Sequence, residues 1–171
     1  SVELRVVGED GRDVAPDERT VGEIRVRGNT VSPGYYEDPE ATREAFEDGW
    51  LKTGDLAVID GEGYVTIVDR KKDVIKTGGE TVYSTEVENA LLSHPAVLEA
   101  AVFGAPDPAW GERVCAAVVL RPGSAATARD LETACRERVA GYKVPREIRF
   151  LDELPKTGSG KVSKRLIREQ W

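Results

Sequence analysis

The stretch VDRKKDVIKTGGE, residues 68–80, separates two parts of the chain that have different patterns. Before it, short segments alternate apolar and polar residues around Asp/Gly turns, as in residues 56–69, which predicts antiparallel hairpins. After it, apolar strands alternate with helical patterns, which favours an independent unit of the α+β class with a mixed sheet and about three helices. We therefore place a boundary near Lys72 and expect domains at residues 1–71 and 72–171.

The first part contains one expected helix among its hairpins. Asp38 is suited to cap this helix, and Pro39 is suited to its first position because its backbone has no N–H to leave unpaired. Hairpins with a single small helix are typical of the end of a larger fold. We expect this part to be the C-terminal end of a larger, β-barrel-like domain.

The second part begins with an amphipathic helix in TEVENALLSHP, where the spacing of Thr85 and Glu88 predicts a capping box and Pro95 ends the helix. We expect two apolar strands to follow, at residues 97–107 and 113–123, and then a helix at residues 127–140. After these we expect a strand at residues 147–154, a Gly/Ser-rich loop at 155–161 and a basic terminal helix at 162–170.

Composition restricts the function. The 171 residues carry a net charge of −7, which argues against sequence-independent binding to nucleic acid. No apolar run approaches the roughly 20 residues that cross a bilayer, and no signal peptide is visible, so we expect a cytoplasmic protein. Cys115 and Cys135 are expected to be buried, in neither a disulfide nor a metal site. Because the sequence lacks Met, we expect it to come from a longer polypeptide.

Two stretches near the boundary could bind a ligand. WLKTGD, residues 50–55, ends in a carboxylate that can accept two hydrogen bonds from a vicinal diol, although this stretch alone favours an Asp that simply caps the turn. Arg70 offers a planar set of five donors for ribose or phosphate oxygens, and Gly78 and Gly79 allow a ligand to approach the backbone closely. The alternative interpretation of these residues is a charged linker followed by a turn.

Two further stretches are basic. In PKTGSGK, residues 155–161, the glycines make a mobile loop that ends in Lys161, a compact cation able to reach a phosphate. This is not a phosphate-binding P-loop, because the GxxxxGK[ST] pattern is absent. In YKVPREIRF, Lys143 and Arg146 flank a proline at the entry to a strand. Each stretch alone is typical of an exposed surface.

Taken in order, these stretches resemble the later motifs of the adenylate-forming superfamily, which contains acyl-CoA synthetases, peptide-synthetase adenylation domains and firefly luciferase. Two of its motifs resemble the stretches GEIRVRGNTVSPGYYEDPEAT and WLKTGD. Its hinge motif resembles GYVTIVDRKKDVIKTGGETVYSTEVE. YKVP and PKTGSGK match its last two. The resemblance extends from about Val21 to Trp171, and it implies that residues 72–171 are the C-terminal lid of such an enzyme.

The resemblance implies a reaction in two steps. A carboxylic acid and ATP give an acyl-adenylate and pyrophosphate, and the thiol of coenzyme A then displaces AMP. It places Asp55 and Arg70 at the ribose, Lys72 at the pivot of the lid, and Lys161 in the active site during adenylation.

For the second step, the resemblance places the backbone of Gly78 and Gly79 along the pantetheine tunnel. Arg136 and Lys143 are candidates for the phosphates of coenzyme A on position and charge alone.

The upstream motifs of the superfamily, including its phosphate loop and acyl pocket, are missing. The chain alone is therefore expected to be inactive, with the N-terminal domain of the same polypeptide as its partner. ATP with Mg²⁺, coenzyme A and a carboxylic acid would be substrates of the complete protein, and no metal site is expected here.

The sequence IKTGGETVYSTEVE after the hinge looks more like ligases for fatty, aromatic or other small acids than like carrier-loading adenylation domains. A fatty or related acid is the expected substrate. Carrier-protein loading stays an alternative, as does a non-catalytic module that binds nucleotide or coenzyme A.

Overall fold

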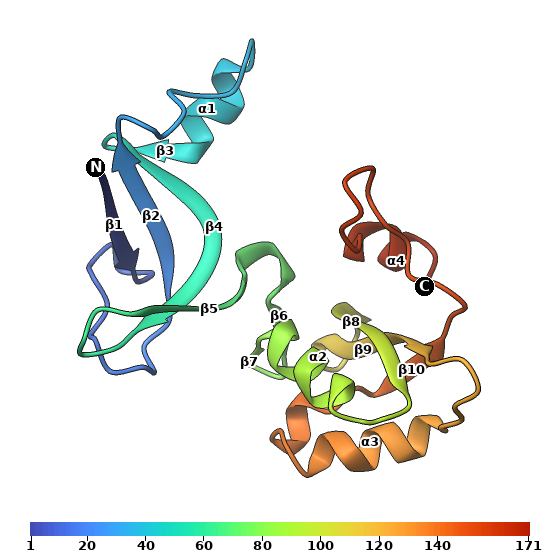
Figure 1. Ribbon diagram of the computed structural model, residues 1–171. Helices are drawn as coiled ribbons and strands as arrows, with labels where there is room; N and C mark the ends of the chain where they lie inside the picture. Colours follow the sequence, from blue (N-terminus) through green and yellow to red (C-terminus); the bar gives the residue numbers. More distant parts are fainter. The chain divides into compact units, whose positions relative to one another are not determined.

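The computed structural model describes all residues 1–171, which form two compact units, Ser1–Lys72 and Asp73–Trp171 (Figure 1). We call them the N-terminal unit and the C-terminal unit. The division falls inside η1 (Lys71–Asp73), a 3-10 helix of one turn. None of the helices is long and apolar enough to span a membrane.

The N-terminal unit is a five-stranded antiparallel sheet with one helix, α1 (Pro39–Ala45). The order is β1-β2-β4-β3, and β5 pairs with β4. Its predicted helix start is confirmed, because the Asp38 carboxylate accepts a hydrogen bond from the amide of Ala41 at 2.9 Å and Pro39 follows it. The strands are β1 (Val2–Val7), β2 (Gly22–Gly28), β3 (Phe46–Glu47), β4 (Trp50–Ile59) and β5 (Val65–Arg70).

The C-terminal unit has a mixed five-stranded sheet, because β10 runs parallel to β9 while the other pairs are antiparallel. With three α-helices, it confirms the predicted α+β class. Its strands are β6 (Ile75–Thr77), β7 (Glu80–Val82), β8 (Val97–Asp107), β9 (Gly111–Leu120) and β10 (Glu147–Phe150). Its helices are α2 (Ser84–Leu92), α3 (Ala128–Arg136) and α4 (Lys164–Glu169), with a 3-10 turn η2 (Gly141–Lys143).

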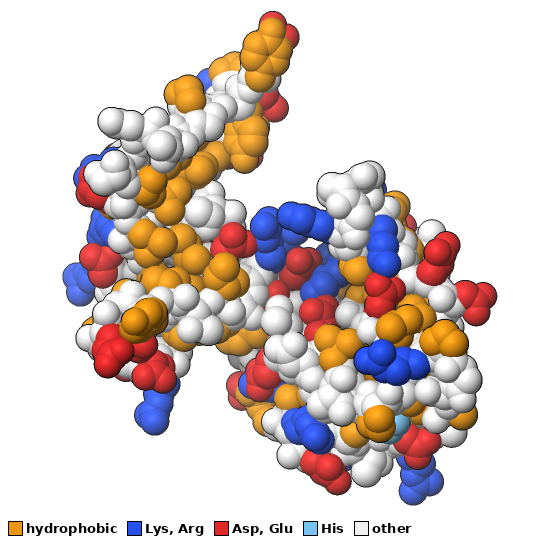
Figure 2. Space-filling view, viewed as in Figure 1, with side chains coloured by type: hydrophobic (Ala, Val, Ile, Leu, Met, Phe, Trp, Pro, Cys, Tyr) orange, Lys and Arg blue, Asp and Glu red, His pale blue; other side chains and the backbone are white.

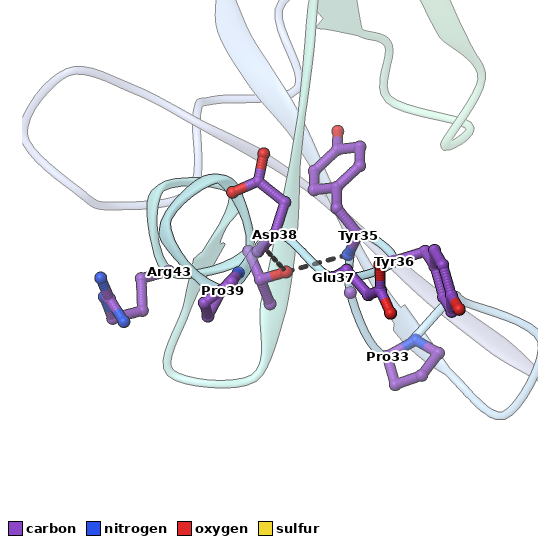
Figure 3. A pocket seen from close by; sticks show the side chains of 9 residues that line it. Pro33, Tyr35, Tyr36, Glu37, Asp38, Pro39 and Arg43 are labelled. Atoms are coloured by element: carbon purple, nitrogen blue, oxygen red, sulfur yellow. Dashed lines mark hydrogen bonds between the residues drawn. The ribbon is translucent and has the colours of Figure 1, made fainter.

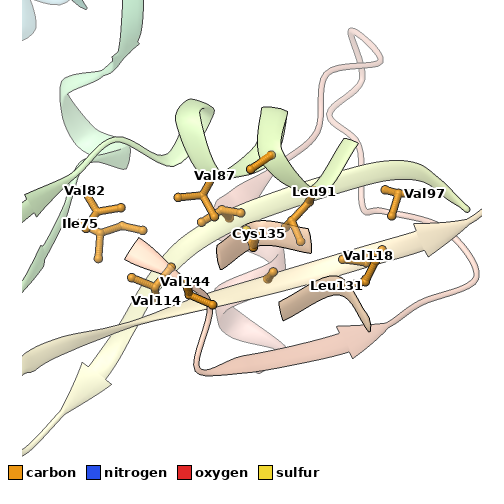
Figure 4. Packing of buried hydrophobic residues seen from close by; sticks show 13 residues of the cluster. Ile75, Val82, Val87, Leu91, Val97, Val114, Val118, Leu131, Cys135 and Val144 are labelled. Carbon is orange, nitrogen blue, oxygen red and sulfur yellow. The ribbon is translucent and has the colours of Figure 1, made fainter. Parts of the chain in front are cut away.

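Both faces of this sheet are covered, which explains why β8 and β9 are almost continuously apolar. Successive side chains of a strand point to opposite faces. On β9, Val114, Ala116 and Val118 therefore join the cluster beneath α2 and α3 (Figure 4). Cys115 and Ala117 face the other side, in a cluster with Ile167 of α4. The terminal helix thus belongs to the core of the unit.

The predicted capping box at Thr85 and Glu88 is wrong. Helix α2 begins one residue earlier, at Ser84, and its N-cap is Tyr83, which makes no capping hydrogen bond through its side chain. Thr85 therefore lies inside the first turn, where it cannot cap. The Glu88 carboxylate instead accepts a hydrogen bond from the amide of Val102 at 2.9 Å.

A capping box does form at the start of α3. The Thr127 hydroxyl accepts a hydrogen bond from the Asp130 amide at 3.2 Å, and the Asp130 carboxylate accepts one from the Thr127 amide at 2.8 Å. The carboxylate thus accepts from the Thr127 amide, and it also accepts from the Thr127 hydroxyl at 2.7 Å. Both bonds favour the ionised form, so the pKa of Asp130 lies below its usual value of 3.8. Helix α3 ends at Arg136, short of the predicted residue 140.

Candidate functional site

Asp55 and Arg70 face each other across β4 and β5. Arg70 Nε lies 2.6 Å from Asp55 Oδ1, and their side chains are 54% and 25% exposed. The Thr53 hydroxyl accepts a hydrogen bond from the amide of Asp55 at 3.1 Å and donates one to the carbonyl of Ile24 at 2.8 Å. The hairpin therefore holds a carboxylate and a guanidinium side by side at an accessible edge. Together they offer both acceptors and donors to a ribose.

This pair borders an open pocket of about 360 Å³ that is lined by Thr53, Gly54, Arg70, Lys71 and Lys72. The Lys71 ammonium is held by Glu23 at 3.0 Å. Lys72 is exposed in η1 and its ammonium has no partner, so nothing in the N-terminal unit fixes this side chain.

The glycine pair forms the turn between β6 and β7. Thr77 pairs with Glu80 across a two-residue loop, and φ is 58° at Gly78 and 85° at Gly79, as a type I′ turn requires. A Cβ atom on Gly78 would lie 2.5 Å from Cε3 of Trp110, whereas one on Gly79 would meet nothing within 4 Å. Gly78 is therefore exposed but has the Trp110 ring against the side where a Cβ atom would lie, and Gly79 is the glycine that faces open space.

The two candidates for the phosphates of coenzyme A have different surroundings. Arg136 is exposed and lines an open pocket of about 340 Å³ with Arg146 and four other residues: Glu132, Gly141, Val144 and Pro145. Lys143 is only 17% exposed, and its ammonium donates to both carboxylate oxygens of Glu86, at 2.9 and 2.7 Å. Arg136 and Arg146 therefore present two cationic groups that form no ion pair at one pocket, while the charge of Lys143 is compensated.

Lys161 is part of a closed hairpin at residues 155–163, which we call the Lys161 hairpin. The Thr157 amide donates to the carbonyl of Lys161 at 2.7 Å, and the Gly160 amide donates back to the carbonyl of Thr157 at 2.8 Å. Lys156 and Val162 form a β-bridge at its base. The sequence indicated a mobile loop, but these bonds define a shaped turn. The Lys161 side chain is exposed, and its ammonium contacts no acidic group of the chain.

Two contributors, Trp110 and Lys164, were not recognised as site residues in the sequence, and Arg146 was noted only as flanking a proline. Trp110 covers Gly78, and the guanidinium of Arg146 lies 4.6 Å from the centre of the Trp110 ring. Lys164 binds Glu88 at 2.7 Å, beside the Lys161 hairpin. The sequence signal was weak, since an isolated Trp and a Lys in a basic helix usually lie on a solvated surface.

A wide pocket of about 700 Å³ lies at the start of α1 (Figure 3). Its loop is held by the Thr42 hydroxyl, which accepts a hydrogen bond from the Tyr35 amide at 2.9 Å and donates one to the carbonyl of Asp38 at 2.8 Å. Tyr36 is 90% exposed. We assign this pocket no chemistry.

Basic and acidic side chains are interspersed on the surface seen in Figure 2. No three His, Cys, Asp or Glu side chains are grouped in a way that could hold a metal ion. Both cysteines are free and buried, and burial raises the pKa of Cys115 and raises that of Cys135 to about 11. Neither thiol is therefore a ready nucleophile.

Comparison with known proteins places these features in a family. Residues 86–161 match the model of the AMP-binding enzyme C-terminal domain. A feruloyl-CoA synthase of Amycolatopsis sp is 47% identical over 169 residues, which are 99% of this chain and 34% of that protein. The chain therefore spans about a third of the length of this curated relative.

Solved structures agree. An amide bond synthetase from Marinactinospora thermotolerans superimposes with a TM-score of 0.91 at 37% identity, over 99% of this chain and 35% of that one. An o-succinylbenzoate CoA synthetase from Bacillus subtilis, in complex with its acyl-adenylate intermediate, gives 0.88 at 42% identity, over 99% and 33%. The chain belongs to the adenylate-forming enzymes, the family of the acyl-CoA synthetases, and corresponds to their C-terminal portion.

Proposed function

We propose that the chain is the C-terminal part of an AMP-forming acid–CoA ligase. Residues 1–71 would complete a larger N-terminal domain, and residues 72–171 would form the lid that closes over the active site. The observation that carries this proposal is the exposed, unpartnered ammonium of Lys161 at the end of an ordered hairpin. A cation without a partner in its own unit is suited to a ligand brought by the rest of the enzyme.

In the first step, a carboxylate oxygen of the acid would attack the α-phosphorus of ATP, and the bond to the β-phosphate oxygen would break to release pyrophosphate. Negative charge is then shared by the α-phosphate and the attacking oxygen. A positioned ammonium stabilises such charge where water is excluded, and we assign this role to Lys161. Asp55 and Arg70 would hold the ribose hydroxyls.

In the second step, the thiol of coenzyme A would lose its proton and attack the acyl carbon, with AMP as the leaving group. Because Gly79 faces open space, it is the glycine we assign to the pantetheine path. Arg136 and Arg146 would contact the phosphates of coenzyme A at their shared pocket. Lys143, which Glu86 neutralises, would act there only after breaking that pair.

Mg²⁺ would accompany ATP in the complete enzyme. The side chains of this chain do not form a metal site, so we assign no step to the ion. The acid itself would bind in the absent part. The sequence favours a fatty or related acid, and the feruloyl-CoA synthase relative adds hydroxycinnamic acids to the candidates.

The test uses the complete enzyme that contains this chain, with fatty, benzoic and cinnamic acids as substrates. We expect acid-dependent release of pyrophosphate from ATP, and formation of a thioester when coenzyme A is added. The chain of residues 1–171 should release no pyrophosphate under the same conditions. Pyrophosphate release by the isolated chain would show that it is not merely a lid with part of another domain.

A second acceptor is an amine, which the likeness to an amide bond synthetase favours. The first step would be unchanged, and the amine nitrogen would attack the acyl carbon in place of the thiol. The same assay distinguishes the two, with an amine panel added instead of coenzyme A. Amide formation without any thioester would replace the CoA ligase assignment.

A further inference from the structure

We propose that Lys164 is a positioning residue, whose ion pair with Glu88 fixes the direction in which the Lys161 hairpin leaves the C-terminal unit. The inference rests on the proposed role of Lys161 in adenylation. The inference goes beyond that role because it makes the rate of adenylation depend partly on the ion pair of Lys164 and Glu88, whose side chains contact no substrate.

The contact joins three elements. Lys164 Nζ lies 2.7 Å from Glu88 Oε1 and donates to the Ser84 hydroxyl at 2.6 Å. Glu88 Oε1 also accepts the hydrogen bond from the Val102 amide. One ammonium therefore links the start of α4 to the first half of α2 and, through Glu88, to the backbone of β8.

The position of Lys164 is unfavourable for a cation unless it has such a partner. Lys164 is the first residue of α4, where the helix dipole repels positive charge. Its side chain is only 15% exposed and that of Glu88 only 18%, so both charges have lost most of their hydration. Partly buried ion pairs are weak evidence of stability, but they require a defined geometry. We therefore interpret this pair as fixing orientation, while Ile167 supplies cohesion in the apolar cluster.

The hairpin and α4 form one hydrogen-bonded piece. The amide of Ser163 donates to the carbonyl of Pro155 at 2.8 Å and closes the hairpin, and its hydroxyl caps α4 by accepting from the Leu166 amide at 3.4 Å. A change in the direction of α4 at Lys164 is therefore transmitted to Lys161. Because both residues lie on the same short connection, a small tilt displaces the ammonium.

Two other ion pairs connect the Lys161 hairpin and α4 to the rest of the unit, and both fix the orientation of the hairpin less strictly. Lys156 binds Glu99 at 2.8 Å, but these side chains are 45% and 32% exposed. Arg168 is 3.7 Å from Asp73, near the limit of an ion pair. The pair of Lys164 and Glu88 is therefore the shortest of the three and the best shielded from solvent.

The experiment uses the complete enzyme with Lys164→Met, which keeps the length of the side chain and removes the charge. In single-turnover measurements at saturating ATP and acid, we expect acyl-adenylate formation to slow about tenfold, the effect of displacing a reacting group by a fraction of an ångström. The KM for ATP and the transfer of preformed acyl-adenylate to coenzyme A should each stay within about twofold. Lys164→Arg should restore most of the rate, since it keeps the ion pair.

Arg165→Gln is the matched control. It removes one positive charge from the adjacent position of α4, but its side chain is 75% exposed and pairs only with Glu169. Its adenylation rate should equal that of the unmodified enzyme. A tenfold loss in this control would show that the total charge of the helix matters, and would overturn the role of Lys164.

A double variant separates positioning from stability. Lys164→Met with Glu88→Gln leaves no unpaired charge, so its melting temperature should recover relative to Lys164→Met alone, while adenylation should stay slow. If the rate recovers together with the melting temperature, the pair is only structural and the inference is wrong.

Lys161→Ala, measured in parallel, distinguishes this inference from the proposed function. Normal adenylation in Lys161→Ala would overturn the proposed function itself. Slow adenylation in Lys161→Ala with a normal rate in Lys164→Met would overturn only the positioning role.

Discussion

Lys161 is the residue on which the proposed chemistry most depends. Its side chain is exposed and has no partner, so Lys161→Ala should change the free energy of unfolding by less than about 0.5 kcal/mol. In the complete enzyme, it should slow acyl-adenylate formation roughly 100-fold or more, the scale for losing one preorganised electrostatic contact. Transfer of preformed acyl-adenylate to coenzyme A should survive. Urea unfolding and single-turnover kinetics give the three values.

Acylation of the Lys161 amine would remove the same charge and should reproduce the effect of Lys161→Ala. The assignment is wrong if Lys161→Ala slows both half-reactions alike, or slows neither.

Asp55 is expected to act on nucleotide binding and not on folding. Its pair with Arg70 is half exposed, and such pairs contribute about 0–1 kcal/mol to stability. Asp55→Asn should therefore leave the melting temperature nearly unchanged while raising the KM for ATP about tenfold, because one charge-assisted hydrogen bond to the ribose is lost. Steady-state kinetics with ATP and with 2′-deoxy-ATP test this. An equal KM ratio of the two nucleotides in Asp55→Asn and in the unmodified enzyme would contradict contact with the ribose.

At the scale of single residues, the sequence predicted the types of group but not their partners. Asp55 stood out as a carboxylate suited to a diol and Arg70 as a planar set of donors, and the structure places them opposite each other on β4 and β5. Glu86, which neutralises Lys143, lies far from it in the sequence, so no local pattern could reveal that pair. The same separation hid the contact between Lys164 and Glu88.

At the scale of the elements, the two glycines of the turn between β6 and β7 should differ in how much a substitution destabilises the chain. Gly78→Ala should destabilise the chain by about 2 kcal/mol or more, because its Cβ atom would overlap the Trp110 ring at a positive φ. Gly79→Ala should lose only about 1 kcal/mol, since only the backbone conformation is strained. Urea unfolding of the two variants measures this difference. Equal losses of unfolding free energy in the two variants would show that the Trp110 ring moves aside without an energetic cost.

The same turn carries a functional prediction for its open position. A leucine at Gly79 should obstruct pantetheine and slow thioester formation, while acyl-adenylate formation stays within about threefold. Equal loss of both half-reactions in Gly79→Leu would refute the place of Gly79 in the tunnel.

The start of α3 supplies a prediction of pH dependence. The folded-state pKa of Asp130 is lowered by the hydrogen bonds from Thr127, so its contribution to stability is full above the usual value of 3.8 and is lost as pH falls through the lowered value. In urea unfolding, the unmodified chain should therefore have a higher free energy of unfolding than Asp130→Ala near neutral pH, and this difference should disappear on acidification. Asp17, whose pKa is lowered to about 2 by hydrogen bonds from Thr20, titrates in the same acidic range. Only the difference in stability between the two proteins isolates Asp130, and a difference that does not shrink as the pH falls below 3.8 would contradict the prediction.

Helix boundaries were harder to predict than strands. The long apolar runs of β8 and β9 are diagnostic because both of their faces are buried. The capping pattern at Thr85 misled because α2 begins one residue earlier, at Ser84, with Tyr83 as an N-cap that makes no side-chain capping bond. The Ser84 hydroxyl instead accepts a hydrogen bond from Lys164, which is distant in the sequence. At Thr127 the local pattern and the tertiary fold agree.

At the scale of the whole molecule, the division between the two units falls after Lys72 in the sequence, and the family relationship covers both. The change of pattern near residue 70 was visible in the sequence because hairpins give way to alternating strands and helices. The chain covers about a third of the feruloyl-CoA synthase relative, so the identity of the acid is a question for the complete enzyme.

The last prediction concerns this boundary. If the lid presents different faces in the two steps, the backbone at the pivot must rotate, and Lys72 lies at the end of the N-terminal unit within η1. Proline holds φ near −65° and restricts the preceding residue, so Lys72→Pro should trap one arrangement of the lid. We expect one half-reaction to stay within about threefold of normal and the other to fall at least 100-fold. Lys72→Ala is the control: it removes the same side chain but leaves φ free, so both half-reactions should be retained. If Lys72→Ala abolishes turnover as Lys72→Pro does, the side chain is required for chemistry, and the pivot must be sought at another residue of η1.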